Sequence, residues 1–247
     1  MLLITILCIL CILAFLHLFS KPKEGLSCSY GNAFDSEHVS YYDTLVYDGL
    51  KQSQEVFFLD PILQPNSIVL DVGSGTGHFV NALQEKGHHA TGVDSSNAMI
   101  QYAKKRYSHD YLLGDVTNTS LFSNGSFSHI CCLYYTIYYF NKARFFQNAY
   151  EWLMPDGYLI VHLSKEWKYG PTSKFCGPFT YSSSHVYDKH HEFVTVNKKR
   201  KRFEHKIKWS SISFVLSLAK QYGFTVHSIY SYPLPYHGEF LYVFHKS

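Results

Sequence analysis

Residues 68–77 read IVLDVGSGTG, an apolar run followed by three glycines at every second position. A short apolar run bounded by glycine is typical of a buried strand. Glycine lets the backbone adopt dihedral angles that a side chain would forbid, and it lets a ligand approach closely. We therefore expect a strand over residues 68–72 that ends in a loop of bare backbone, with the carboxylate of Asp71 at its entrance.

The chain around this stretch alternates short apolar runs with helical patterns, which predicts repeated βα units and a parallel sheet. Asn141 and either Ser95 or Ser96 are suited to begin two of the helices, because their side chains can accept backbone N–H hydrogen bonds. A terminal hairpin would add an antiparallel edge. The prediction is an α/β, doubly wound, mostly parallel sheet of seven strands at residues 68–72, 90–93, 111–113, 130–134, 158–163, 225–232 and 240–244.

The predicted domain organisation has three parts. Residues 1–20 form a transmembrane anchor, residues 21–65 a juxtamembrane segment and helical cap, and residues 66–247 the main domain. Within the main domain, residues 193–209 alternate around a basic turn, which predicts an inserted β-hairpin. Its basic run at 198–202 is either a solvated tip or a contact for anionic lipid headgroups.

The first segment is apolar from residue 2 to residue 19, and as a helix it would extend roughly 27 Å. A cleaved signal peptide would begin with basic residues, which this segment lacks, so an uncleaved single-pass anchor is favoured. Lys21 and Lys23 follow it. By the positive-inside rule, we expect the rest of the chain in the cytosol.

Charge and cysteine spacing argue against two classes of partner. A net charge of +3 and a pI near 8.4 are too mild for a nucleic-acid-binding surface. The six cysteines follow no metal-ligand spacing, and we expect no bound metal and a reducing compartment.

The glycine loop favours a ligand with a cationic group. Dinucleotide sites use Gly-x-Gly-x-x-Gly, whereas the spacing here is Gly-x-Gly-x-Gly. A phosphate would also be repelled by Asp71. An amino-acid ammonium group suits this loop better.

These residues resemble class I S-adenosylmethionine-dependent methyltransferases, which have a Rossmann-like fold. Residues 69–77 are similar to the family's first motif, which implies that Asp71 lies near the cofactor's ammonium group. The resemblance further implies that Asp94 binds both ribose hydroxyls and that residues 114–116 meet the adenine. The implied cofactor-binding residues are Asp71, Gly73, Gly75, Gly77, Asp94, Ser95, Met99, Asp115 and Val116.

The acceptor side is less defined by the resemblance. The family's fourth strand often opens with Phe-Asp, whereas this chain has Phe127-Ser128, and residues 132–135 do not match the motif of base methyltransferases. Residues facing the methyl group should follow the fourth and fifth strands, where Tyr134, Tyr138 and the two catalytic candidates, Tyr135 and His162, are found. Tyr42 and Tyr47 of the cap are expected to close over the cofactor.

The leading hypothesis is a membrane-anchored methyltransferase acting on a small or lipid-like acceptor. One alternative is a catalytically silent module of the same fold that binds a partner at a membrane. Another is a nicotinamide-binding domain, which the glycine spacing disfavours.

Overall fold

The computed structural model describes residues 28–32, 34–165, 173–176, 179–186, 189–196 and 199–247. Within these ranges no helix combines the length and apolar character needed to cross a membrane. The predicted anchor lies outside the described residues. Two β-sheets make up the strands that are described, one of seven strands and one of five.

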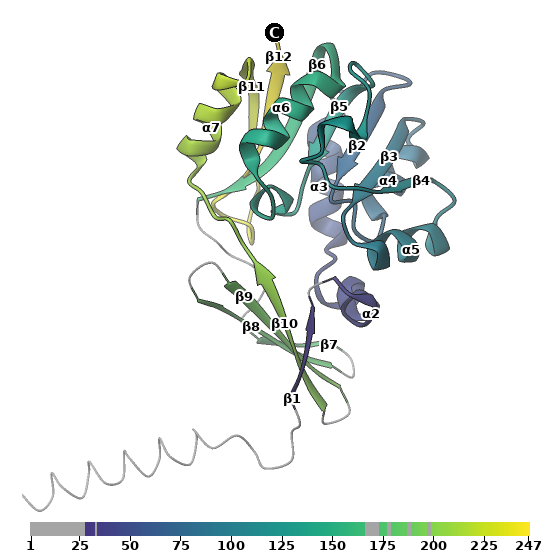
Figure 1. Cartoon of the computed structure of the whole chain (residues 1–247), viewed down its shortest axis with the longest axis vertical. Helices are drawn as coiled ribbons and strands as arrows, with labels where there is room; N and C mark the ends of the chain where they lie inside the picture. The colour runs from purple at the N-terminus through teal and green to yellow at the C-terminus, as the bar shows by residue number, and fades with distance from the viewer. Residues whose placement is uncertain (1–27, 33, 166–172, 177–178, 187–188, 197–198) are drawn as a thin grey trace, which may run out of the picture.

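The larger sheet confirms the predicted mostly parallel α/β architecture (Figure 1). Its strand order is β11-β12-β6-β5-β2-β3-β4. The five strands β6, β5, β2, β3 and β4 are parallel to one another. Strand β12 runs antiparallel to β6 and pairs with β11 as the expected terminal hairpin. The bounds are β2 Ile68–Val72, β3 His89–Asp94, β4 Asp110–Leu113, β5 Phe127–Cys132, β6 Leu153–Ser164, β11 Phe224–Ser231 and β12 Glu239–Lys246.

Helices cover both faces of this sheet, because successive strand residues point to opposite sides. Leu70 and Cys132 belong to one apolar cluster, which contains residues of α6 and α7. Their neighbours Val69 and Cys131 belong to a second cluster, which contains residues of α3, α4 and α5. The helices are α3 Gly49–Leu59, α4 His78–Glu85, α5 Asn97–Arg106, α6 Lys142–Trp152 and α7 Ile212–Gln221.

Polar side chains begin the helices where the sequence places them. Asn141 accepts a hydrogen bond from the Arg144 N–H at the start of α6. Of the two serines considered for α5, Ser96 is the cap and accepts from the Met99 N–H. Each cap satisfies a backbone donor that the helix itself leaves without a partner.

The smaller sheet differs from the sequence-based expectation. The hairpin predicted at 193–209 is formed by β9 (Lys189–Val196) and β10 (Lys199–Lys206), but it is the centre of a sheet ordered β1-β10-β9-β8-β7. Strands β7 (Ser173–Cys176) and β8 (Phe179–Val186) were not predicted. In Figure 1 this sheet lies below the larger one, on the side of α2 (Ser36–Leu45).

The segment before the first predicted strand is helical only in part. Helices α2 and α3 begin after Asp35 and Asp48, whose carboxylates accept backbone N–H hydrogen bonds. Upstream of them, β1 (Cys28–Asn32) is a strand that pairs in parallel with β10. The cap is therefore joined to the smaller sheet.

The strand order reverses beside β2, which pairs with β3 on one side and with β5 on the other. Open α/β sheets bind ligands at such a reversal, outside the carboxyl ends of the strands. The segments that leave β2 and β5 therefore define where a site is expected, including the short 3-10 helix η2 (Thr136–Tyr138). A second 3-10 helix, η1 (Thr119–Leu121), lies between β4 and β5.

Candidate functional site: a cleft at the sheet reversal

The glycine loop leaves β2 with a backbone that requires glycine. Gly73 and Gly75 have φ angles of +71° and +52°. A Cβ atom on Gly73 would lie 2.4 Å from Thr136 Cγ2, so the loop and η2 approach each other closely only because no side chain intervenes. Gly77 differs, since its added Cβ would meet Tyr111 and it does not line the cleft. Gly77 is the residue that precedes α4, and it takes up a left-handed conformation there, with φ +85°.

A cavity of about 310 Å³ opens over this loop. Most of the predicted cofactor residues line it together with aromatic side chains. The lining residues from the glycine loop and the strand ends are Val72, Gly73, Gly75, Val93, Asp94, Ser95, Met99, Gly114, Asp115 and Val116. The other lining residues, five of them aromatic, are Phe34, Tyr42, Tyr134, Thr136, Tyr139 and Phe140.

Asp94 joins the loop to the end of β3. One carboxylate oxygen accepts the Gly75 N–H at 3.0 Å, and the other accepts the Ser96 N–H at 2.8 Å. Burial raises the pKa of Asp94, and the backbone hydrogen bonds partly offset that rise. Each oxygen keeps a further lone pair, so the carboxylate can still accept hydrogen bonds from a diol.

Asp71 faces a smaller neighbouring cavity of about 60 Å³. Its side chain is buried, with a relative exposure of 4%, and within the described part of the chain nothing donates a hydrogen bond to its carboxylate. Burial raises its pKa well above the usual value, and the nearby Glu55 and Asp94 carboxyls add to the rise. A buried carboxylate without a partner is costly, and a cationic ligand would relieve that cost.

The helical cap closes over the glycine loop. Asp43 of α2 accepts a hydrogen bond from Thr76 Oγ1 at 2.6 Å, forms an ion pair with Arg106 and lies 3.1 Å from His78 Nε2. The ring of Tyr47 stacks on His78 with centroids 3.8 Å apart. Tyr47 lines the smaller cavity and Tyr42 lines both, which is where the sequence placed these two residues.

The chain leaves β5 through two consecutive left-handed residues, Tyr134 with φ +47° and Tyr135 with φ +63°. Such conformations are uncommon for residues other than glycine and cluster at functional sites. Tyr134 lines both cavities, and its hydroxyl donates to the Asp48 carbonyl at 2.9 Å.

The two catalytic candidates lie beside the cleft and not in its lining. The Tyr135 and His162 rings are 4.5 Å apart, and His162 has no exposed surface. Burial, with a contribution from Lys51, lowers the pKa of His162 to about 4, so its imidazole is neutral at pH 7. Tyr138, the remaining candidate, does not line the cleft, and its hydroxyl accepts a hydrogen bond from the Ser164 N–H at 3.3 Å.

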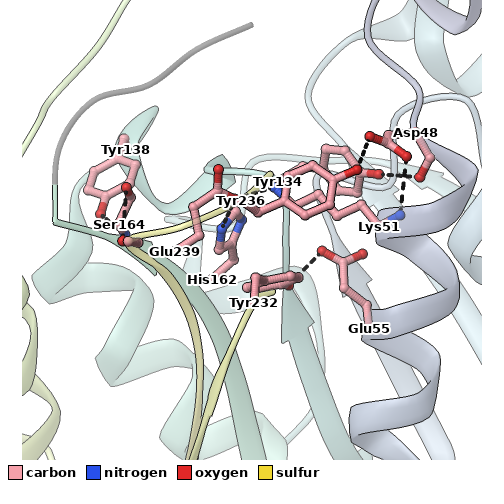
Figure 2. A network of polar contacts seen from close by, with 11 residues as sticks. Asp48, Lys51, Glu55, Tyr134, Tyr138, His162, Ser164, Tyr232, Tyr236 and Glu239 are labelled. Carbon is pink, nitrogen blue, oxygen red and sulfur yellow. Dashed lines mark hydrogen bonds and ion pairs between the residues drawn. The ribbon is translucent and has the colours of Figure 1, made fainter. Parts of the chain in front are cut away.

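The sequence-based search missed a buried polar network around these candidates (Figure 2). Lys51 Nζ donates to Glu239 Oε2 at 2.5 Å, and His162 Nε2 lies 3.0 Å from the same oxygen. Tyr232 donates to Glu55 at 2.9 Å. The acidic and aromatic segment at 232–239 was the available signal, but its partners on α3 lie almost two hundred residues earlier.

The chemistry of the cleft fits a cofactor that carries an ammonium group and a diol. Asp71 supplies a buried carboxyl group that accepts no hydrogen bond from the described residues, and Asp94 supplies further acceptor sites. The glycine loop allows close approach of the ligand to the backbone. A phosphate would meet two carboxylates here.

Residues 69–157 match a family model described as a methyltransferase domain. Over this segment the chain is similar to class I S-adenosylmethionine-dependent methyltransferases, whose fold its solved structural neighbours share. In this family the methyl donor is S-adenosylmethionine, and a solved structural neighbour, the amino pentose methyltransferase CalS10 from Micromonospora echinaspora, contains it. CalS10 has a TM-score of 0.64 at 15% identity, with 89% of this chain and all of that chain covered.

A second solved methyltransferase, CcbJ from Streptomyces caelestis, has a TM-score of 0.71 at 16% identity and covers 87% of this chain and 98% of its own. Phosphoethanolamine N-methyltransferase from Plasmodium falciparum is 29% identical over 143 residues, 53% of each chain. Malonyl-[acyl-carrier protein] O-methyltransferase from Pectobacterium atrosepticum is 43% identical over 54 residues, covering 22% of this chain and 21% of its own. The chain thus spans about half of the length of the first relative and about a fifth of the second.

Proposed function

We propose that this chain transfers a methyl group from S-adenosylmethionine to a small-molecule or lipid-like acceptor. One observation carries the proposal: a single cavity is lined both by the glycine loop with Asp94 and by a group of aromatic rings. A donor bound against the loop and an acceptor bound against the rings would share one space. Proximity and orientation of this kind can supply about 7–11 kcal/mol of the barrier.

S-adenosylmethionine supplies, when bound, a sulfonium methyl group that is open to in-line attack. Asp71 would then offset the cationic charge of the bound cofactor, and Asp94 would hold its ribose. The aromatic rings would exclude water from the acceptor, which would strengthen the electrostatic contacts that remain. In-line attack needs little covalent chemistry from the protein, so these positioning roles carry most of the proposed catalysis.

Tyr134 is proposed to position the acceptor and not to remove its proton. Burial and the nearby Glu55 raise its pKa, so its hydroxyl stays protonated at pH 7 and donates to the Asp48 carbonyl. A general base that works near neutrality should have a pKa close to 7. Burial raises the pKa of Glu55 to about 7, so Glu55 fits that role better than Tyr134 does.

The names of the two curated relatives include both an N-methyl and an O-methyl acceptor. Together they support a small nucleophilic acceptor without deciding its atom. The test is a transfer assay on the full chain in non-ionic detergent, with methyl-labelled S-adenosylmethionine and separate pools of amines, hydroxy compounds and carboxylic acids. We expect S-adenosylhomocysteine and labelled product from one pool.

The folded Asp94→Ala variant is the background for that assay. Product above this background in one pool supports the proposal and identifies the acceptor chemistry. If the cofactor binds but no pool gives product, the proposal is contradicted and the catalytically silent module is favoured.

We also propose that residues 2–19 hold the protein at a membrane, with the methyltransferase domain in the cytosol. The support is the apolar composition of this segment and the lysines that follow it. Carbonate extraction of membranes tests the anchor, and protease protection tests its orientation. Release of the chain by carbonate would contradict the proposal.

A further inference from the structure

Four tyrosine rings surround the ammonium group of Lys51. The ring centroids of Tyr134, Tyr135, Tyr232 and Tyr236 lie 5.1 to 5.2 Å from Lys51 Nζ. A cation within about 6 Å of an aromatic face is attracted by the ring quadrupole, and cages of several rings are used to bind ammonium ligands. We call these four residues the tyrosine cage.

The tyrosine cage shares a wall with the cofactor cleft. Tyr134 belongs to the cage and also lines both cavities. Tyr134 and Tyr135 follow β5 in consecutive left-handed conformations. The cage and the cleft therefore meet at Tyr134.

Hydrogen bonds fix the cage in place (Figure 2). Tyr232 donates to Glu55 at 2.9 Å, and Tyr236 donates to the Asp48 carboxylate. The Tyr134 hydroxyl is held by the Asp48 carbonyl at 2.9 Å. A site whose side chains are already fixed binds a ligand with less loss of entropy.

The carboxyl groups around the cage outnumber the single lysine ammonium beside them. Three carboxyl groups contact the cage or its occupant: Asp48, Glu55 and Glu239. Glu55 Oε2 is buried and has no hydrogen-bond partner among the described residues. Although burial alone would raise the pKa of Glu239, its contacts with His162 and Lys51 lower that pKa to about 2. Since His162 is neutral at pH 7, the cage keeps a surplus of acidic groups.

We propose that the tyrosine cage binds the ammonium group of a cationic amine acceptor and that Lys51 occupies the cage when no acceptor is present. This inference rests on the proposed methyl transfer and narrows its acceptor to amines. The bound ammonium must lose a proton before its nitrogen can attack the methyl group, and Glu55, whose buried Oε2 accepts no hydrogen bond from the described residues, takes that proton. An incoming ammonium group would regain the ring contacts and the Glu239 ion pair that Lys51 gives up. The exchange therefore keeps a cation beside Glu239, whereas an uncharged acceptor would leave that buried carboxylate without one.

The exchange is compatible with where Lys51 is attached. Its side chain is a flexible stem of four methylene groups on the first turn of α3. The neighbouring Leu50 is 76% exposed, and Leu234, between two of the cage tyrosines, is 83% exposed. The cage thus lies just beneath the surface, and a small cation can reach it through a short displacement of side chains.

Tetramethylammonium is the probe, since it has the charge of a methylated amine and accepts no further methyl group. It is titrated by calorimetry into the full chain in non-ionic detergent, with and without saturating S-adenosylhomocysteine, and tert-butanol is the uncharged control of similar shape. We expect saturable binding of tetramethylammonium and none of tert-butanol. Equal binding of the two, or no saturable binding by the folded wild type, would overturn the proposal.

Matched variants locate the binding. Tyr236→Leu removes one ring and should weaken binding about tenfold, whereas Tyr236→Phe keeps the ring and should stay within about threefold. Tyr230→Leu is the control outside the cage, since Tyr230 stacks on Phe58. Lys51→Met removes the competing ammonium and should tighten binding at least tenfold; unchanged affinity in this variant would exclude Lys51 as a displaceable occupant.

The same samples separate this inference from the proposed function. Binding of S-adenosylhomocysteine without tetramethylammonium binding rejects the cage as an acceptor site and leaves methyl transfer intact. Failure to bind S-adenosylhomocysteine counts against methyl transfer itself.

Discussion

Replacing Asp71 with asparagine should change stability and cofactor affinity in opposite directions. In the free protein, the Asp71 carboxylate is buried and receives no hydrogen bond from the described residues. Its folded pKa is raised above its usual value of 3.8, mainly by burial. Ionisation of Asp71 therefore opposes folding, and this unfavourable contribution grows as the pH rises through 3.8 and persists at neutral pH.

The asparagine amide has nearly the same shape and costs less to bury than a carboxylate. The free Asp71→Asn variant should therefore melt at a higher temperature than the wild type at pH 7. Its affinity for S-adenosylmethionine should fall, because a hydrogen bond to a charged group contributes about 1.5–3 kcal/mol. That loss corresponds to roughly tenfold to a hundredfold weaker binding.

Differential scanning calorimetry and binding calorimetry on the same preparation measure both effects. Asp60→Asn is the matched control, since this half-exposed surface carboxylate pairs with Lys86 far from the cleft, and it should leave cofactor affinity unchanged. A folded Asp71→Asn variant that binds S-adenosylmethionine as tightly as the wild type would refute the assignment. A lower melting temperature of the free variant would refute the reasoning from burial.

Two other perturbations test the network and the loop. Glu239→Gln leaves Lys51 buried without its counter-charge and should lower the free energy of unfolding by about 3–5 kcal/mol in urea titrations. In the wild type, the stabilisation from Glu239 should be lost as the pH falls from 4.5 to about 2, and this part of the pH dependence should be missing in the variant. Gly73→Ala places a Cβ 2.4 Å from Thr136 and should abolish cofactor binding. Gly87→Ala has a similar left-handed φ of +87° but nothing within 4 Å, so it should cost about 1–2 kcal/mol of stability and retain binding, and equal binding by both alanine variants would contradict the role of the loop.

The sheet and the cofactor end of the cleft were predictable because their signals are local. A strand, a glycine loop and the next strand's terminal acid follow one another within the 27 residues from Ile68 to Asp94, and the reversal of strand order then brings Asp94 to the loop. Parallel strands end at one edge of the sheet, so residues that follow the strands meet there without further information.

The tyrosine cage was not predictable because its parts are distant in sequence. Lys51 and Glu239 are separated by 188 positions, and no spacing rule joins them. Strand-end reasoning predicted Tyr135 and His162 at this edge of the sheet, and both lie beside the cleft, but it could not give the direction of their side chains. Tyr135 is the second of two left-handed residues after β5, and only the backbone geometry reveals that conformation.

The smaller sheet was predicted only in part. The alternation at 193–209 predicted the hairpin of β9 and β10, in which Phe203 and His205 of β10 are buried, but it gave no sign of β1, β7 or β8. Within β10, which reads KRKRFEHK, basic side chains with long apolar stems occupy several positions of the strand. Pairing with β9 on one side and β1 on the other then determines the structure of this segment.

Calorimetric titration of the folded full chain with S-adenosylmethionine tests the central claim most directly, with Asp94→Ala and NADH as controls. The account predicts binding with a dissociation constant on the order of micromolar, at least tenfold weaker in the Asp94→Ala variant, and no binding of NADH. Absence of S-adenosylmethionine binding by the folded wild type would contradict the account.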